Sequence, residues 1–264
     1  MLSKTSPPHK QNPFPRPDIE HWWAVEAMIA SYNYVYQVTY GTKYETEGPI
    51  GVSIYGDASV ASFHYEFLAL SEEADSILEA VRAYPIPENR QYVIDVFHPQ
   101  PSSPELKKKF LTSGYEFVRT GMILGMELPT TIKTLSHTIH KAKTIQQAET
   151  ANHSLAREGE RIYTQILRDE HIHSFYATVH DEAAGWTQLV TVYPGAGYIN
   201  QLYVLKPHRR HRLGTALIRY AHRQARELGS SRMVLVPSEM ALPLYRRLGY
   251  RPLVYFSIFR LGRD

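Results

Sequence analysis

The sequence of 264 residues contains no cysteine. This absence excludes disulfide bonds, thiolate metal ligands and a cysteine nucleophile, and it makes a cytoplasmic protein the default expectation. Long apolar runs are also missing, because no uninterrupted stretch approaches the roughly 20 residues needed to cross a bilayer. We therefore expect no membrane partner. The remaining composition is typical of a globular protein, with 43% hydrophobic and 21% charged residues.

An excess of charge of one sign is nearly absent as well. The 29 Lys and Arg residues exceed the 26 Asp and Glu residues by only three, which does not require a nucleic-acid partner. Residues 1–17 are rich in proline and lack the apolar core of a signal peptide, so we interpret them as a tail. The rest of the chain is long enough for two domains, which we place at 18–130 and 131–264.

Helical and strand patterns alternate through the first of these domains. Asp18 is the expected N-cap of the first helix and Ser71 that of the second. The predicted elements are a helix at 18–32, strands at 32–40, 49–56 and 61–70, a helix at 71–83, a strand at 91–97, a helix at 105–114 and a strand at 115–128, with a linker at 129–136.

The second domain shows a similar alternation. The segment DEAAG at 181–185 predicts a hairpin turn, and Gly229 is placed to end a helix. The predicted elements are a strand at 138–142, a helix at 145–157, strands at 173–180, 185–193 and 198–205, a helix at 213–229, a strand at 232–237, a helix at 239–249 and a strand at 253–261. This order indicates a mixed α/β fold.

The two domains repeat each other near their ends. FLTSGYEF, which begins at Phe110, and YRRLGYRP, which begins at Tyr245, both place Gly-Tyr four and five residues after an aromatic residue. Each is followed by a strand and preceded by strand, helix and strand in the same order. The shared order favours an internal duplication.

The stretch RRHRLGTALI at 209–218 follows a strand and opens a helix. A glycine-bearing loop at this place directs successive backbone N–H groups into one concavity at the positive end of the helix dipole, which suits a phosphate. Gly214 permits close approach, while Arg209, Arg210 and Arg212 add positive charge. The competing interpretation is a solvated basic turn.

LYVLKPHRRHRLGTALI, together with the later LYRRLGY, resembles the GNAT superfamily of acyl-CoA-dependent N-acyltransferases. Arg209, Leu213 and Gly214 match the pyrophosphate loop of that family, whereas Arg212 stands where its first glycine is usual. Such a departure is tolerated if the backbone there is not left-handed. The resemblance covers about residues 137–260 and implies the family's mixed sheet, splayed beside one strand.

The resemblance implies roles for individual residues. The backbone of Leu202, Tyr203 and Val204 would bond the pantetheine arm of acetyl-CoA, the cosubstrate, as an added strand would. Backbone amides of Arg209, Arg210, His211, Arg212, Leu213, Gly214 and Thr215 would hold the pyrophosphate. Tyr245 matches the family's general acid, and a phenol suits the task because its pKa of about 10 keeps it protonated at neutral pH.

No general base stands out. Asn200 occupies the place where the family often has glutamate, and an amide cannot take a proton from an ammonium. The remaining candidates are Asp181, Glu182, His171, His173 and Tyr198, or the amine binds already neutral. Asn200 and Tyr198 are expected to contact the acceptor. His171 and His173 lack a third ligand, so we expect no metal.

These observations favour an acetyltransferase that acts on the primary amine of a small molecule. The alternatives are transfer to a protein amine or an aminoacyl-tRNA, since Arg219, Arg223 and Arg226 add basic charge, and a non-catalytic acyl-CoA sensor, suggested by Asn200. The acyl length and the oligomeric state stay open, with a homodimer among the alternatives.

The first domain is expected to be a degenerate copy. Phe110 replaces the acidic phenol, and Glu72 and Glu73 would repel a pyrophosphate. We expect it to cover the second domain and to build a wall of the acceptor pocket with Trp22, Trp23 and the tyrosine-rich segments, unless these aromatics are simply core.

Overall fold

The computed structural model describes residues 18–55, 63–133 and 136–262. The predicted tail at 1–17 lies outside this range. The first half of the chain contains α1 (Trp22–Tyr40), β1 (Lys43–Glu47), β2 (Ile50–Ile54), β3 (Tyr65–Ala69), α2 (Ala74–Ala83), β4 (Tyr92–His98), α3 (Pro104–Thr112) and β5 (Tyr115–Glu127).

The second half has one element more at its start, a strand before the first helix. Its elements are β6 (Thr138–Lys141), α4 (Ile145–Leu155), the short 3-10 helices η1 (Ala156–Glu158) and η2 (Thr164–Ile166), β7 (Ile172–Val179), β8 (Glu182–Val190), β9 (Ala196–Val204), η3 (Lys206–His208), α5 (Leu213–Glu227), β10 (Arg232–Leu235), α6 (Leu242–Arg247) and β11 (Arg251–Leu261).

All the described strands join one mixed sheet, in the order β1-β2-β3-β4-β11-β5-β10-β9-β8-β7-β6. The prediction of a mixed α/β fold is therefore confirmed. The strand pairings repeat between the halves, because β1-β2-β3 and β7-β8-β9 are antiparallel meanders and the last strand of each meander pairs in parallel with the next strand, β4 or β10.

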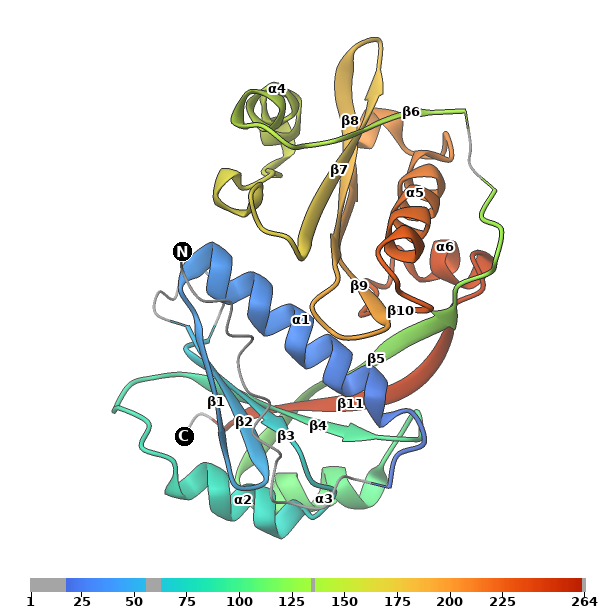
Figure 1. The fold of residues 1–264 in the computed structure, drawn as a ribbon. Coiled ribbons are helices and arrows are strands. Elements are labelled where there is room, and N and C mark those ends of the chain that lie inside the picture. The colour runs from blue at the N-terminus through green and yellow to red at the C-terminus, as the bar shows by residue number, and fades with distance from the viewer. Residues whose placement is uncertain (1–17, 56–62, 134–135, 263–264) are drawn as a thin grey trace, which may run out of the picture.

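The two halves exchange their last strands. β5 ends the first half but pairs with β10 of the second, while β11 ends the second half and pairs with β4 of the first. β5 and β11 also pair with each other along ten registered positions, from Arg251 opposite Gly125 to Leu261 opposite Tyr115. Figure 1 shows these two strands running together from α6 into the first half. The sheet therefore continues across the predicted boundary at 130/131.

Helices cover both faces of this sheet. In the first half, α2 packs against one face, where Ile77, Leu78 and Val81 meet Phe67 and Ile94. In the second half, α5 and α6 cover one face of β7 to β10, and α4 covers β8 on the other face. α1 lies across the junction of the halves (Figure 1) and shares a buried cluster with residues of both, including Phe97 and Tyr198. None of the described helices combines the length and the apolarity that a bilayer span requires.

The predicted strand at 32–40 is wrong, because this segment is the second half of the 19-residue helix α1. Its aromatic residues favour strands in isolation, but Tyr32, Tyr36 and Tyr40 are spaced four apart and stack along one helix face. Their ring centroids are 4.4 Å apart between the first two and 5.4 Å between the last two. Tertiary packing decides the structure here.

Smaller corrections concern where elements begin. The N-cap of α1 is His21 rather than Asp18, and that of α2 is Glu73 rather than Ser71, whose hydroxyl instead accepts a hydrogen bond from the Glu73 N–H at 3.1 Å. The β7–β8 turn is not DEAAG but the pair His180–Asp181, both left-handed with φ of 49° and 63°, as a two-residue hairpin of type I′ requires.

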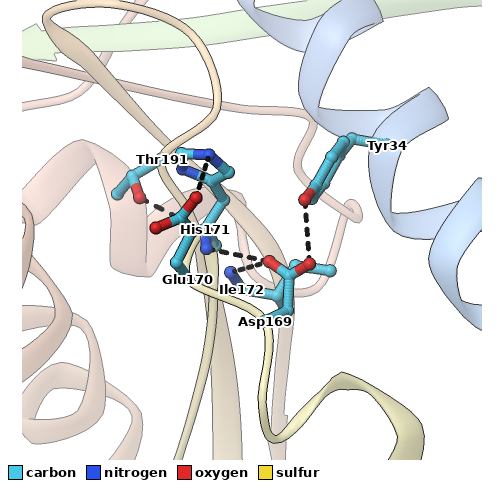
Figure 2. A network of polar contacts seen from close by, with 6 residues as sticks. All are labelled: Tyr34, Asp169, Glu170, His171, Ile172 and Thr191. Carbon is cyan, nitrogen blue, oxygen red and sulfur yellow. Dashed lines mark hydrogen bonds and ion pairs between the residues drawn. The ribbon is translucent and has the colours of Figure 1, made fainter. Parts of the chain in front are cut away.

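A polar network fastens α1 to the second half (Figure 2). The Tyr34 hydroxyl donates a hydrogen bond of 2.8 Å to Asp169, whose other carboxylate oxygen accepts from the N–H groups of His171 and Ile172 at 2.8 and 3.0 Å. The Tyr34 ring also meets the His171 ring edge-on, with centroids 5.7 Å apart. α1 is thereby held beside the start of β7, and this fixes the wall that it forms at the site described next.

Candidate active site

β9 leaves its neighbour β10 halfway along its length. The parallel pairing ends at Ile199 opposite Leu235, while pairing with β8 continues to Val204 opposite Gly185. The departure coincides with a β-bulge at Asn200, because Gln188 is opposite Gln201 and Leu189 is opposite Ile199. Bulges of this kind end pairing and redirect side chains, often next to active sites. Beyond Ile199, one backbone edge of β9, at Leu202, Tyr203 and Val204, pairs with no described strand.

The loop after β9 is bent by two left-handed residues. Arg210 has φ of 67° and Arg212 has φ of 59°, and both side chains are exposed, as is that of His211. An arginine is readily tolerated in place of glycine at 212 only where the backbone is not left-handed, and the backbone of Arg212 is left-handed. An L-residue pays about 1–2 kcal/mol for this conformation, whereas glycine does not.

Successive backbone N–H groups in this loop lack acceptors. None of the N–H groups of residues 210–215 donates a hydrogen bond to the described protein, and the first that does is that of Ala216, which bonds the Arg212 carbonyl at 3.0 Å. No side chain caps α5 at Arg212. Free donors at the positive end of a 15-residue helix form an anion-binding concavity.

The Arg209 side chain contacts the end of β9. Its Nε donates a hydrogen bond to the Val204 carbonyl at 2.9 Å, and its guanidinium lies 5.4 Å from the centre of the Tyr203 ring. The Tyr203 hydroxyl in turn donates to Glu158 at 2.8 Å. Arg209 therefore ties the end of β9 to the loop, which leaves Arg210 and Arg212 as the exposed cations.

Gly214 is buried where α5 meets α6 and β9. A Cβ atom added to it would lie 3.0 Å from Cδ1 of Leu244, 3.7 Å from Val204 and 3.9 Å from Leu202. Only a hydrogen atom fits here without displacing Leu244. This absence of a side chain lets the first turn of α5 lie directly beside the open edge of β9, so both backbone sites face the same region.

Tyr245 lies on α6 and is only 4% exposed. Its ring meets that of Tyr250 edge-on at 5.5 Å, and burial raises the pKa of its phenol. Tyr245 also raises the pKa of Tyr198, which places the two phenols near each other. In the first half, Phe110 of α3 is fully buried and stacks on Phe259 at 4.3 Å, so it serves packing.

A cavity of about 220 Å³ lies between α1 and the second half. Asn200 reaches it from the bulge and donates a hydrogen bond of 2.7 Å to the buried Gln188. The other lining residues are Val35, Tyr36, Thr39 and Tyr40 of α1, Gly159, Glu160, Arg161 and Tyr163 of the loops after α4, and Trp186 and Gln201 of the sheet. The hydroxyls of Tyr40 and Tyr163 lie 2.7 Å apart and join the two sides.

The matching family model is that of the acetyltransferase (GNAT) family, over residues 139–250. Residues 139–250 are similar to a GNAT domain. No curated protein matches this chain. Among solved structures, a GCN5-related N-acetyltransferase from Kribbella flavida is 19% identical, with a TM-score of 0.66 over 90% of this chain and 96% of that one. A second, from Sphaerobacter thermophilus, is 15% identical, with a TM-score of 0.54 over 83% and 79%. At these identities they show a common fold, and it includes the first half.

The residues that the sequence offered as a general base do not line the cavity. Asp181 and Glu182 lie at the β7–β8 turn, where Glu182 pairs with Arg157 at 3.2 Å. His171 belongs to the network of Figure 2. His173 is buried, and its Nδ1 lies 3.0 Å from Nζ of Lys141. Burial, assisted by Lys141, lowers the pKa of His173 to about 4, so this ring is a weak base at neutral pH.

The acceptor side of the site differs in part from its sequence-based description. Tyr198 is buried against α1 and is not among the residues that line the cavity, whereas Asn200 is. The wall contributed by α1 consists of Tyr36 and Tyr40 rather than Trp22 and Trp23. Trp22 packs edge-on against Phe97 at 5.9 Å, and Trp23 lies under Arg232 at 4.0 Å.

Two charged lining residues, Glu160 and Arg161, were missed from the sequence. They follow a helix in an irregular loop and belong to no motif, so local sequence contains no signal for them. The described residues contain no group of three side chains that could hold a metal.

Proposed function

We propose that this protein transfers an acetyl group from acetyl-CoA to the primary amine of a small molecule. The observation that carries the proposal is the run of unbonded N–H groups at 210–215 beside the open edge of β9, next to a cavity. A pyrophosphate needs the first feature and an extended amide-bearing arm needs the second. Acetyl-CoA has both groups, joined in one molecule.

In this proposal the backbone of Leu202, Tyr203 and Val204 bonds the pantetheine arm. The amides from Arg210 to Thr215 surround the pyrophosphate, where the exposed side chains of Arg210, His211 and Arg212 add positive charge. The Arg209 N–H, which the sequence-based prediction included, is bonded instead to the Lys206 carbonyl at 3.3 Å. The thioester then lies near the bulge, where Asn200 contacts the acceptor, whereas Tyr198 is buried and lines no part of the cavity.

Tyr245 acts as the general acid. The acceptor nitrogen attacks the thioester carbon, the carbon–sulfur bond breaks, and the departing sulfur takes the phenolic proton. The new amide nitrogen releases its extra proton to solvent, and the phenolate is reprotonated from solvent. Burial raises the pKa of Tyr245, so the proton is present at neutral pH. A small acceptor is favoured because pockets for drug-sized ligands measure about 300–1,000 Å³, more than the 220 Å³ found here.

The first half, in this proposal, binds no acetyl-CoA of its own. α2 begins at Ala74 directly after Glu72 and Glu73, whose charges oppose an anion there, and Phe110 has no proton to give. Its contribution is α1, which closes the acceptor cavity. Titration should therefore find one acetyl-CoA per chain.

The proposal is tested by thiol release from acetyl-CoA with a panel of amines that includes peptides and aminoacyl-tRNA. Tyr245→Phe keeps the ring and removes the proton, so turnover should fall roughly 10²- to 10⁴-fold while acetyl-CoA affinity is nearly kept. Full activity of this variant would contradict the role of Tyr245. Binding without turnover of any amine would indicate an acyl-CoA sensor, and activity only with macromolecular amines would replace the small acceptor.

A further inference from the structure

The cavity between α1 and the second half carries two opposite charges at adjacent positions. Glu160 and Arg161 are the charged side chains among its lining residues, and the others are aromatic, amide, hydroxyl or small. A carboxylate and a guanidinium that line one small cavity favour a ligand that itself carries both charges. Neutral hydrogen-bonding groups around them can bond the rest of such a ligand.

Glu160 lies on the side of the sheet. Its Oε2 accepts a hydrogen bond of 3.0 Å from the indole N–H of Trp186, on β8 opposite Tyr203 of β9. The carboxylate is half-buried, and its other oxygen is bonded by no described residue. An ammonium group at this end of the cavity would lie beside the strand along which the thioester is proposed to bind.

Arg161 lies on the side of α1. Its guanidinium is 5.2 Å from the centre of the Tyr163 ring, and it forms no ion pair with a carboxylate in the described part of the chain. Burial raises the pKa of Tyr40, and the positive charge of Arg161 acts against that effect, so the guanidinium lies close to Tyr40 as well. Its donors are free for a planar anion such as a carboxylate.

We propose that the acceptor is an amine that also carries a carboxylate, of the amino-acid class, held with its amino group at Glu160 and its carboxylate at Arg161. This inference rests on the proposed acetyl transfer and names its substrate class. A cavity of about 220 Å³ holds one such small zwitterion.

Glu160 also supplies the proton acceptor that Asn200 cannot be. The ammonium loses one proton to the Glu160 carboxylate, directly or through a water, and the free amine attacks the thioester carbon. A carbon–nitrogen bond forms, the carbon–sulfur bond breaks, the sulfur takes the proton of Tyr245, and the new amide nitrogen releases its remaining extra proton to solvent. Glu160 then returns its proton to solvent, and the phenol is reprotonated from solvent.

The test compares each amino acid with the amine that differs only by lacking the carboxylate. The wild-type kcat/KM should be higher for the amino acid. Arg161→Gln should lower kcat/KM for the amino acids roughly 10- to 100-fold, the value of a charge-assisted hydrogen bond, and leave the simple amines within about threefold. Arg168→Gln, an exposed arginine outside the cavity lining, is the matched control and should change neither.

Glu160→Gln tests the role of Glu160 as proton acceptor separately from the recognition of the carboxylate by Arg161. The amide can still accept from Trp186, but it takes no proton, so kcat should fall for both substrate classes. Trp186 provides a readout without turnover, because a ligand at Glu160 changes the surroundings of its indole. Amino acids should change its fluorescence at lower concentration than the matched amines do, and Arg161→Gln should remove that difference.

Equal or better use of amines without a carboxylate, together with equal fluorescence titrations, would overturn the inference while leaving acetyl transfer intact. An equal loss for both substrate classes in Arg161→Gln would overturn it as well. Failure of the proposed function has a different signature, in which acetyl-CoA does not bind to the wild-type chain. The fluorescence comparison decides on the amino-acid class even in that case.

Discussion

The left-handed arginine at the start of α5 gives a prediction whose size can be worked out. Arg212 has φ of 59° and ψ of 11° and is the N-cap of the helix. An L-residue in this conformation is destabilised by about 1–2 kcal/mol relative to glycine in the folded state. Glycine loses about 0.5–1 kcal/mol more backbone entropy on folding. The difference favours glycine by roughly 0.5–1 kcal/mol.

Arg212→Gly and Arg212→Ala should therefore be compared with each other. Both remove the guanidinium and its repulsion of the helix dipole, so this contribution cancels between them. The glycine variant should unfold at a higher urea concentration than the alanine variant, and its thermal midpoint should be about 2 °C higher.

Arg209 supplies the control for this comparison. Its φ is −70°, an ordinary conformation for any residue, and its side chain is lost equally in both variants. Arg209→Gly should therefore be less stable than Arg209→Ala, by about 0.5–1 kcal/mol. If glycine and alanine rank in the same order at both positions, the left-handed conformation of Arg212, and with it the described form of the loop, is refuted.

Three further predictions concern the cofactor, the first half and pH. Gly214→Glu should abolish acetyl-CoA binding in calorimetry, because the side chain displaces Leu244 and adds negative charge. Arg210→Ala should weaken binding less. Unchanged affinity in a folded Gly214→Glu variant would refute the phosphate site. Residues 131–264 alone should be insoluble unless co-expressed with 18–130, because β10 loses β5 and β11 loses β4; a soluble monomer of the fragment would contradict this. Burial raises the pKa of Glu66 to about 7, so the folded state holds a proton that the unfolded state releases at lower pH, and stability should fall by about 1–3 kcal/mol between about pH 5 and about pH 8. Urea midpoints should show this fall in the wild type and a smaller one in Glu66→Gln, where the buried Asp95, whose pKa burial also raises, remains; an equal fall in both would show that Glu66 does not contribute.

Much of the second half could be predicted because its local signals agree with each other. The helix at 213–229 combines an apolar face, which includes Leu213 and Leu217, with Gly229 at a left-handed position of φ 89°, and the structure has α5 there. The strands at 173–180 and 198–205 have β-branched and aromatic residues and turns on either side. Where periodicity, propensity and end signals coincide, the prediction holds.

The first helix shows where local signals compete. Tyr34, Tyr36 and Tyr40 belong to a segment whose composition favours a strand, and their spacing of two and four fits either structure. What decides is contact with the second half, through Asp169 to Tyr34 and Tyr163 to Tyr40. These partners lie more than 120 residues away in the chain, so the sequence of the segment itself does not indicate them.

The exchange of strands and the cavity could not be predicted, for the same reason, because both depend on contacts between distant segments. β5 and β11 have similar patterns, and nothing within either strand specifies that each pairs with the other half. Glu160 and Arg161 line a cavity only because α1 packs across from them. The loop at 209–215 could be recognised because its function depends on contiguous backbone, whereas the acceptor site is assembled from distant segments.

Acetyl transfer to a small amino acid can be measured by incubating the full chain with acetyl-CoA and that amino acid, and by following free thiol and the mass of the acceptor together. We expect thiol release that depends on the acceptor, with one acetyl group gained by the acceptor for each thiol released. Thiol release at the same rate without acceptor, or none despite bound acetyl-CoA, would contradict this expectation.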